Sequence, residues 1–392
     1  MRFIGNIDTR RITLTAVLIF LSACNGSSSS SNTATGSTPV SNNPASLTRF
    51  TFSKDGLPQR DYVVYIPSSL PSNAPMVVYL HGCNQTADDA IAGTRWNELA
   101  DVRRFVVVYP EQKNPNNEED PADQIEGHLG DGNGINCWNW FSPQHQSRDS
   151  GEPATIAGIT REVMARSDIG IDPNRVYLGG ISAGGVMAST MGATYPDLYA
   201  AIAVMAGCGY PACGDPSGAL AAQTMAENAR RMPVILFHGT ADEIAPFPMG
   251  VDALHQWLGT NDWVDNGQPD QSVPPLPAQT INIGFDESLV ANLGNEGDTC
   301  VRNQNSPCPG GVLALQNYPF TIERYADARG CPLIDFWIIH GLAHNYPGGN
   351  PEGNFVDPIG PNITAAAYNF FLANPKNSGF ESGAFDCSAL FP

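Results

Sequence analysis

The stretch Val176-Tyr177-Leu178-Gly179-Gly180-Ile181-Ser182-Ala183-Gly184 joins an apolar run of strand length to a segment with the composition of a helix. It contains the pattern Gly-x-Ser-x-Gly. Glycines on either side of a serine let the backbone turn sharply between a strand and a helix, which holds the serine hydroxyl clear of the sheet. The stretch therefore predicts a strand, a tight turn and a helix, with Ser182 as a nucleophile on the turn.

A serine hydroxyl is a poor nucleophile at neutral pH, so it needs a general base and an orienting carboxylate. Both must lie downstream of Ser182, in loops that follow later strands. Asp242 comes shortly after the apolar run 234–237, and His344 after the apolar run 336–339. We expect Asp242 as the acid and His344 as the base. Without such partners, Gly-x-Ser-x-Gly could equally be a connecting turn.

A reaction at an acyl carbon also needs hydrogen-bond donors for the oxyanion. One donor in this arrangement is the backbone N–H that follows the nucleophile, here Ala183. The other comes from the loop after the third strand, Leu80-His81-Gly82-Cys83-Asn84, where we assign the N–H of Cys83.

Short apolar runs alternate with longer helical stretches along the chain. The runs of strand length are 49–53, 62–66, 76–80, 105–109, 176–178, 201–205, 234–237 and 336–339, the first two as a hairpin. The stretches of helix length are 153–166, 184–195, 220–231 and 363–372. Unbroken apolar runs are typical of buried parallel strands. The alternation predicts an α/β-hydrolase fold, with a mostly parallel sheet and helices on both faces.

Two segments break this alternation. Residues 113–136 are polar, acidic and Gly-rich, and residues 259–319 are rich in Pro, Asn and Asp. Loops this long in a compact domain are usually functional or are insertions. We expect 259–319 to be an insertion between the acid and the histidine, and a candidate lid. The acidic residues of 118–131 could bind Ca²⁺, but their spacing matches no EF-hand loop, so a solvated acidic loop is the stronger alternative.

The composition of the chain limits the classes of molecule that it can bind. Lys and Arg number 20 against 39 Asp and Glu, and the formal charge is −19. A chain this acidic repels a polyphosphate backbone, which excludes nucleic acid binding. No metal ion or cofactor is expected, and we expect a monomer.

The amino terminus has the pattern of an export signal. Basic residues precede an apolar run that is too short to span a bilayer, which predicts a signal peptide over residues 1–23. The run ends Leu21-Ser22-Ala23-Cys24, which resembles the lipobox of bacterial lipoproteins and implies lipid on Cys24. The alternative is an ordinary cleavage site followed by a free cysteine. Residues 24–46 carry this anchor and a Ser/Thr/Asn-rich flexible linker. We expect an exported protein, in the outer membrane or extracellular, attached to the membrane through Cys24.

Nine cysteines, less the one at Cys24, leave an even set of eight. In an oxidising compartment an even set predicts a disulfide framework. Cys208 and Cys213 could close a small loop. Cys300, Cys308, Cys331 and Cys387 allow three connectivities, and we expect Cys331 to join Cys300 or Cys308. The other two are Cys83 and Cys137.

Long ordered blocks carry a resemblance to a known family. They are Val77-Val78-Tyr79-Leu80-His81-Gly82-Cys83-Asn84-Gln85-Thr86, Phe105-Val106-Val107-Val108-Tyr109-Pro110-Glu111-Gln112, Asn136-Cys137-Trp138-Asn139-Trp140-Phe141 and Ile171-Asp172-Pro173-Asn174-Arg175-Val176-Tyr177. They resemble the catalytic domain of extracellular poly(3-hydroxybutyrate) depolymerases, a family related to feruloyl and acetylxylan esterases of carbohydrate esterase family 1. The resemblance implies a catalytic domain over 47–375 and a C-terminal tail over 376–392.

The resemblance also implies site residues. By position it assigns the nucleophile, acid and base to Ser182, Asp242 and His344. It suggests that Cys83 pairs with Cys137, which would stiffen the oxyanion loop. Trp140 is expected to form a wall of the substrate site, with a core tryptophan as the alternative. The chain ends soon after its last helix, so no separate substrate-binding domain is expected.

Three functions follow for testing. The first is a lipid-anchored serine esterase that hydrolyses hydroxyalkanoate polyester or oligomer esters through an acyl-enzyme. The second is a feruloyl or acetylxylan esterase that acts on plant polysaccharide, because both substrates present an ester to the same residues. The third is a non-catalytic surface-binding lipoprotein that keeps the fold, and a complete set of catalytic residues argues against it.

Overall fold

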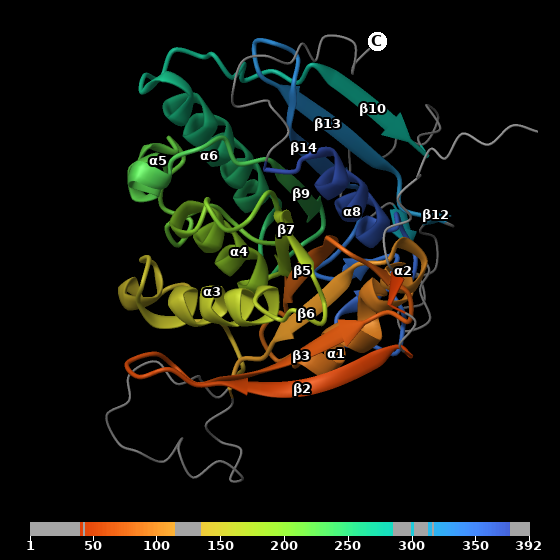
Figure 1. Cartoon of the computed structure of the whole chain (residues 1–392). Coiled ribbons are helices and arrows are strands. Elements are labelled where there is room, and N and C mark those ends of the chain that lie inside the picture. The colour runs from red at the N-terminus through yellow and green to blue at the C-terminus, as the bar shows by residue number, and fades with distance from the viewer. Residues whose placement is uncertain are drawn as a thin grey trace, which may run out of the picture. The chain divides into compact units, whose positions relative to one another are not determined.

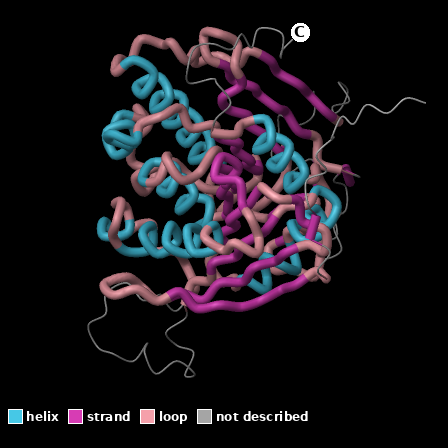
Figure 2. The backbone as a smooth tube through the Cα atoms, in the orientation of Figure 1, coloured by secondary structure: helices cyan, strands magenta, loops and turns pink. Residues whose placement is uncertain are grey.

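The computed structural model describes residues 40–41, 44–113, 135–284, 299–301, 313–315 and 317–376. Across these residues a ten-stranded sheet has the strand order β10-β13-β14-β9-β8-β7-β5-β6-β3-β2 (Figures 1 and 2). Its strands are β2 (Ser46–Phe52), β3 (Arg60–Ile66), β5 (Ala74–Leu80), β6 (Val106–Pro110), β7 (Ile171–Ile181), β8 (Ile202–Met205), β9 (Val234–Gly239), β10 (Gln279–Ile283), β13 (Phe320–Ala326) and β14 (Pro332–Ile339). The helices are α1 (Ala87–Gly93), α2 (Trp96–Arg103), α3 (Gly151–Met164), α4 (Ala183–Thr194), α5 (Ala219–Met225), α6 (Phe247–Asn266) and α8 (Ile363–Ala373), with short 3-10 turns η2 (Pro143–His145) and η3 (Ala226–Asn228).

The centre of the sheet is parallel. Strands β14, β9, β8, β7, β5 and β6 pair in parallel, and antiparallel pairs flank them at both edges. The predicted hairpin forms one of these edges, as β2 and β3. The mostly parallel α/β sheet expected from the sequence is therefore confirmed.

Helices cover both faces of the sheet. Along β5, Met76, Val78 and Leu80 belong to one core cluster, which also contains buried residues of α3, α4 and α6. Val77 and Tyr79 belong to a second cluster, with buried residues of α1, α2 and α8. Successive side chains of a strand point to opposite faces, so a strand covered on both sides must be apolar throughout. Figure 1 shows α3, α4 and α6 together on one side of the sheet.

Some elements differ from expectation. Helices α1, α2 and α6 were not predicted, and the stretch 220–231 forms only the short α5 followed by η3. The segment predicted as an insertion, 259–319, begins inside α6, because the buried Trp257 and Leu258 pack that helix against the sheet. A further part of the segment forms β10, which pairs with β13 at the sheet edge. Its role as a lid stays a prediction.

Among the described residues, three short two-stranded pairs lie outside the main sheet. They are β1 (Val40–Ser41) with β4 (Leu70–Pro71), β11 (Thr299–Val301) with β12 (Leu313–Leu315), and β15 (Tyr346–Pro347) with β16 (Val356–Asp357). The last pair follows the loop that carries His344. It holds that loop near α8, because the buried Tyr346 hydroxyl shares a hydrogen bond of 2.6 Å with Thr364.

Candidate active site

Ser182 occupies the turn between β7 and α4, as the sequence predicts. Its backbone has φ 56° and ψ −122°, a conformation that is strained for a residue with a side chain. Both flanking glycines are required by close packing. A Cβ on Gly184 would overlap the carbonyl oxygen of Leu80, and one on Gly180 would lie 2.5 Å from the backbone of Gly184. The close packing of this turn at the end of β7 therefore requires that neither Gly180 nor Gly184 has a side chain.

Asp242 and His344 lie on loops that follow β9 and β14, and these two strands are parallel neighbours. The structure joins their side chains through a hydrogen bond of 2.8 Å between His344 Nδ1 and Asp242 Oδ2. With Asp242 ionised, Nδ1–H is the donor, so Nε2 of the neutral ring is left as an acceptor. The residues are 102 positions apart in sequence, and the parallel strands bring them together.

The Asp242 carboxylate is buried and well supplied with donors. Its Oδ1 accepts the backbone N–H groups of Ile244 at 3.0 Å and Ala245 at 2.8 Å. Burial alone would raise the pKa of Asp242, but the hydrogen bonds from His344 and Ala245 outweigh it, so the pKa lies below its ordinary value. Asp242 is therefore an anion at neutral pH.

A second histidine supports the same turn. His238, at the end of β9, forms a hydrogen bond of 2.7 Å from Nε2 to the carbonyl oxygen of Ala245. Its Nε2 lies 3.8 Å from Asp242 Oδ2. Burial lowers the pKa of His238 despite the hydrogen bond to Ala245, which favours the neutral ring. His238 thus fixes the turn that aims the Asp242 carboxylate.

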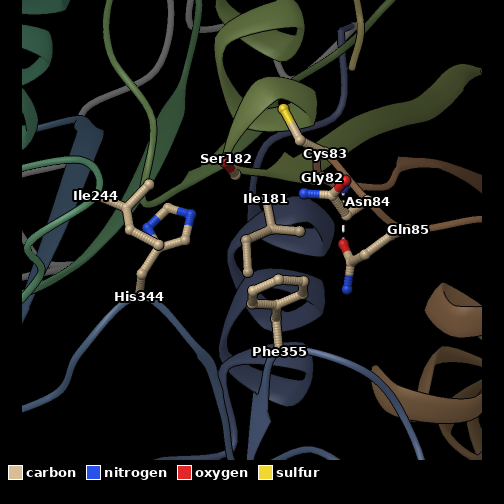
Figure 3. Close-up of a pocket in the computed structure, with 9 residues that line it drawn as sticks. All are labelled: Gly82, Cys83, Asn84, Gln85, Ile181, Ser182, Ile244, His344 and Phe355. Atoms are coloured by element: carbon tan, nitrogen blue, oxygen red, sulfur yellow. Dashed lines mark hydrogen bonds between the residues drawn. The ribbon is translucent and has the colours of Figure 1, made fainter. Parts of the chain in front are cut away.

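Ser182 and His344 line one pocket, with a cavity volume of about 100 Å³ (Figure 3). The residues around it are Gly82, Cys83, Asn84, Gln85, Ile181, Ser182, Ile244, His344 and Phe355. They come from the end of β7 and the turn after it, from the loops after β5, β9 and β14, and from the segment between β15 and β16. The structure therefore brings the predicted nucleophile, base and oxyanion loop to one edge of the sheet.

Two backbone N–H groups in this region are uncommitted. In the loop after β5, the N–H of Gly82 donates to Gln85 Oε1 at 2.7 Å, and that of Asn84 donates to the Ile135 carbonyl at 2.6 Å. Within the part of the chain that the structure describes, the N–H of Cys83 between them has no protein acceptor, and neither has that of Ala183. The first N–H groups of a helix have no intrahelical partner. Both groups are free to donate to a ligand.

A disulfide braces the loop after β5. Cys83 and Cys137 are bonded, with 4.2 Å between their Cα atoms, as the resemblance suggested. Beside it, the buried His81 accepts the N–H of Gln112 at Nε2 and contacts the Gly82 carbonyl through Nδ1. Burial lowers the pKa of His81 to about 4, so its ring is neutral. Trp138 adds a hydrogen bond of 3.1 Å from Nε1 to the His81 carbonyl.

A buried polar cluster lies behind this brace. The carboxylate of Glu152, which is fully buried, accepts hydrogen bonds from the backbone and side chain of Asn139 at 2.7 and 2.9 Å. It also binds Arg60 at 3.1 Å and the side-chain amide of Gln112. Because Gln112 in turn bonds to the Cys137 carbonyl, the cluster links the disulfide to α3.

Other predicted site residues have mixed outcomes. Cys208 is bonded to Cys213, as expected. Cys331 is also in a disulfide. Trp140 is half-buried against the core and stacks edge-on with Phe141, and it is not among the residues around the pocket. Its role in substrate binding stays a prediction. The side chains of Cys24, Cys300, Cys308 and Cys387, and the acidic stretch 118–131, lie outside the described residues.

Sequence reasoning missed Ile244 and Phe355, which add apolar side chains to the pocket (Figure 3). Ile244 follows Asp242 by two positions, and this closeness in sequence to the predicted acid is the signal that could have placed it in the pocket. No sequence signal pointed to Phe355, because it reaches the pocket from an irregular loop in which its own φ is 55°.

Among the described residues, no group of His, Cys, Asp or Glu is arranged to bind a metal ion. None of the helices in the described ranges combines the length and apolar character needed to cross a bilayer.

The sheet order, the serine turn and the acid–histidine pair on neighbouring strands define the fold of the α/β-hydrolases. The chain belongs to the esterase PHB depolymerase family, whose sequence profile matches residues 60–271. Among solved structures, an acetyl xylan esterase from Aspergillus awamori superposes with a TM-score of 0.52 at 20% identity, covering 76% of this chain and 94% of that one.

Named relatives include two kinds of esterase. Poly(3-hydroxyalkanoate) depolymerase C of Paucimonas lemoignei is 29% identical over 326 residues, which are 82% of this chain and 65% of that protein. Poly(3-hydroxybutyrate) depolymerase of Ralstonia pickettii is 24% identical, over 81% of this chain and 59% of its own length. Feruloyl esterase B of Neurospora crassa is 26% identical, over 59% of this chain and 80% of its own length. The chain thus spans less than two thirds of either depolymerase.

Proposed function

We propose that this protein is a serine esterase that hydrolyses hydroxyalkanoate esters, polymeric or oligomeric, through an acyl-enzyme on Ser182. The observation that carries the proposal is the hydrogen bond between His344 and the Asp242 carboxylate, next to Ser182 in one pocket. Membership of the esterase PHB depolymerase family supports the same chemistry.

In the first half of the reaction, Ser182 Oγ attacks the ester carbonyl carbon and its proton passes to His344 Nε2. The ionised Asp242 stabilises the imidazolium that forms. The carbonyl oxygen becomes an oxyanion, which accepts the free N–H groups of Cys83 and Ala183. When the tetrahedral intermediate collapses, the C–O bond to the alcohol breaks and His344 returns the proton to the leaving oxygen.

The second half repeats these steps with water. Nε2 of His344 takes a proton from a water molecule as it attacks the acyl carbon of the Ser182 ester. The intermediate then releases the acid and restores the serine hydroxyl, with the proton returned from His344. The two N–H donors need not move between the halves, since both oxyanions form at the same place.

The shape and polarity of the pocket favour a short aliphatic ester. Ile181, Ile244 and Phe355 supply apolar surface around Ser182. A methyl-bearing hydroxyacyl chain would bury apolar area against these side chains. The similarity to depolymerase C of Paucimonas lemoignei supports this choice.

A second candidate is a feruloyl or acetylxylan esterase. It is favoured by the similarity to feruloyl esterase B, of which this chain covers 80%. The catalytic residues would be the same, so only the substrate that fits beside them differs.

We also propose that the protein is exported and held at a membrane by lipid on Cys24. The disulfides Cys83–Cys137 and Cys208–Cys213 support export, because such bonds persist in oxidising compartments. Cys24→Ser should move the protein from the membrane fraction to the soluble fraction. An unchanged membrane fraction would overturn the lipid anchor.

One substrate panel tests the activity. Purified protein is assayed with p-nitrophenyl butyrate, hydroxybutyrate oligomers, amorphous poly(3-hydroxybutyrate) and methyl ferulate, with Ser182→Ala as the control. We expect turnover of the hydroxybutyrate esters and none with Ser182→Ala. Absence of turnover with every ester would overturn both enzyme candidates. A preference above tenfold for ferulate would favour the second.

A further inference from the structure

Asn84 is the polar residue of the pocket that neither the fold nor the proposed reaction uses. Its neighbour Gln85 has both ends of its amide committed, since Oε1 accepts the Gly82 N–H and Nε2 donates to the Asn354 carbonyl, each at 2.7 Å. The side chain of Asn84 is exposed, and it makes no hydrogen bond to any residue that the structure describes. In Figure 3 its carboxamide points from the rim toward the middle of the pocket.

The backbone at Asn84 is held firmly. Its N–H donates to the Ile135 carbonyl at 2.6 Å, and the preceding residue is in the disulfide with Cys137. Its φ is 57°, in the left-handed region that asparagine tolerates better than most residues. The backbone position from which the carboxamide extends is therefore fixed, directly after the Cys83 N–H that we assign to the oxyanion.

The surroundings of this carboxamide are apolar. Ile181, Ile244 and Phe355 line the same pocket. A hydrogen bond from this carboxamide would favour a substrate with a matching oxygen over an analogue without one, by the amount that a single hydrogen bond contributes. An asparagine side chain can both donate and accept, so it suits a hydroxyl as well as an ester oxygen.

We propose that Asn84 is a specificity residue that hydrogen-bonds the oxygen on the β-carbon of a 3-hydroxyacyl group. With the scissile carbonyl oxygen at the Cys83 N–H, we place the oxygen on the β-carbon, which is further along the acyl chain, at the side chain of the next residue in the pocket. It is a free hydroxyl in a terminal unit and an ester oxygen inside a chain. Simple acyl esters and aromatic acrylate esters have no oxygen there. The inference rests on the proposed function and narrows its substrate to 3-hydroxyacyl esters.

The test compares two esters with the same leaving group, p-nitrophenyl 3-hydroxybutyrate and p-nitrophenyl butyrate. The quantity measured is the ratio of their kcat/KM values. Asn84→Gly removes the carboxamide while allowing the left-handed backbone, and we expect it to lower the ratio about threefold to tenfold, the range for one lost hydrogen bond. Glu227→Gln, an exposed change in η3 at a residue that does not line the pocket, should leave the ratio as in wild type.

Asn84→Asp separates the two forms of the β-oxygen. Aspartate accepts but does not donate, so it can still bind a free hydroxyl but not an esterified oxygen. We expect this variant to keep the preference for p-nitrophenyl 3-hydroxybutyrate and to lose activity toward hydroxybutyrate oligomers relative to it. Thermal unfolding of each variant checks that the fold is retained.

The outcomes are distinct. A wild-type ratio in Asn84→Gly, with the fold retained, would overturn the role of Asn84 and leave the proposed esterase standing, because asparagine would then serve only the backbone conformation. Absence of ester turnover in the wild-type protein would overturn the proposed function, and this inference with it.

Discussion

The two sides of the pocket are held by different means. The loop after β5 is fixed by the disulfide to Cys137 and by the buried ring of His81. On the other side, Asp242 and His344 meet through a single hydrogen bond between two loops. The difference matches the proposed tasks. Donors to an oxyanion must not reorganise during the reaction, whereas a general base gains and loses a proton in every cycle.

The largest effect on kcat is expected from a change on the side of the pocket that carries the acid and the base. Asp242→Asn would keep the size of the side chain but remove the charge and disturb the tautomer of His344. We expect kcat to fall about 10³–10⁴-fold, with little change in thermal stability. The measurement is kcat on p-nitrophenyl butyrate.

The matched control is Glu243→Gln, since this exposed neighbour carries the same charge one position away. It should keep wild-type kcat. Equal kcat values for Asp242→Asn and wild type would contradict the role given to Asp242.

Removing the disulfide between Cys83 and Cys137 tests how the loop after β5 contributes to stability and activity. The double variant Cys83→Ala/Cys137→Ala opens a covalent loop of 54 residues, whereas Cys208→Ala/Cys213→Ala opens one of 5. Chain entropy predicts losses in the free energy of unfolding of about 4 and about 2 kcal/mol. Because only the first pair adjoins an oxyanion donor, we expect kcat to fall about tenfold in that variant alone. Denaturant unfolding and steady-state kinetics measure the two effects.

The comparison would fail if both double variants lost the same fraction of kcat. Such a result would mean that the disulfide of Cys83 serves stability only, as that of Cys208 does.

A smaller effect, on the pH dependence of the free energy of unfolding, is expected from the protonation of His81. Its folded-state pKa of about 4 lies below the value of about 6.5 in an unfolded chain. Between these pH values the unfolded chain binds more protons, so stability falls as pH falls. The contribution of His81 over this window is about 3 kcal/mol. Urea unfolding at pH 7 and pH 4 should show a shallower pH dependence in His81→Gln than in wild type.

His255→Gln is the control, because His255 is exposed, and it should retain the wild-type slope. Burial also lowers the pKa of His238 and of His340, so the variant should flatten the slope without abolishing it. An unchanged slope in His81→Gln would contradict the neutral, buried state of His81.

The sequence predicted the centre of the sheet and the edge formed by β2 and β3, but not the edge formed by β10 and β13. A parallel strand covered on both faces must be apolar throughout. Unbroken apolar runs such as 76–80 and 234–237 therefore predict the buried strands directly. The edge strand β10 and its neighbour β13 contain polar residues such as Asn282 and Glu323, and they give no such run. Helix α6 was missed because Pro248 and Gly259 interrupt its pattern, although its buried face packs on the sheet.

The same contrast holds for the site. The positions of Ser182, Asp242 and His344 could be predicted because the carboxyl ends of parallel strands meet at one edge of a sheet. Ile244 and Phe355 could not, because they reach the pocket through the conformation of irregular loops. The N-terminal signal and lipid anchor stay predictions, since residues 1–39 lie outside the described part of the chain.

The central claim is that Ser182 becomes covalently acylated. The most direct measurement is mass spectrometry of the acid-quenched protein during turnover of p-nitrophenyl butyrate, followed by peptide mapping. We predict a butyryl adduct on the peptide that contains Ser182, and its absence in Ser182→Ala. Full turnover by Ser182→Ala, or an adduct confined to another residue, would contradict the account.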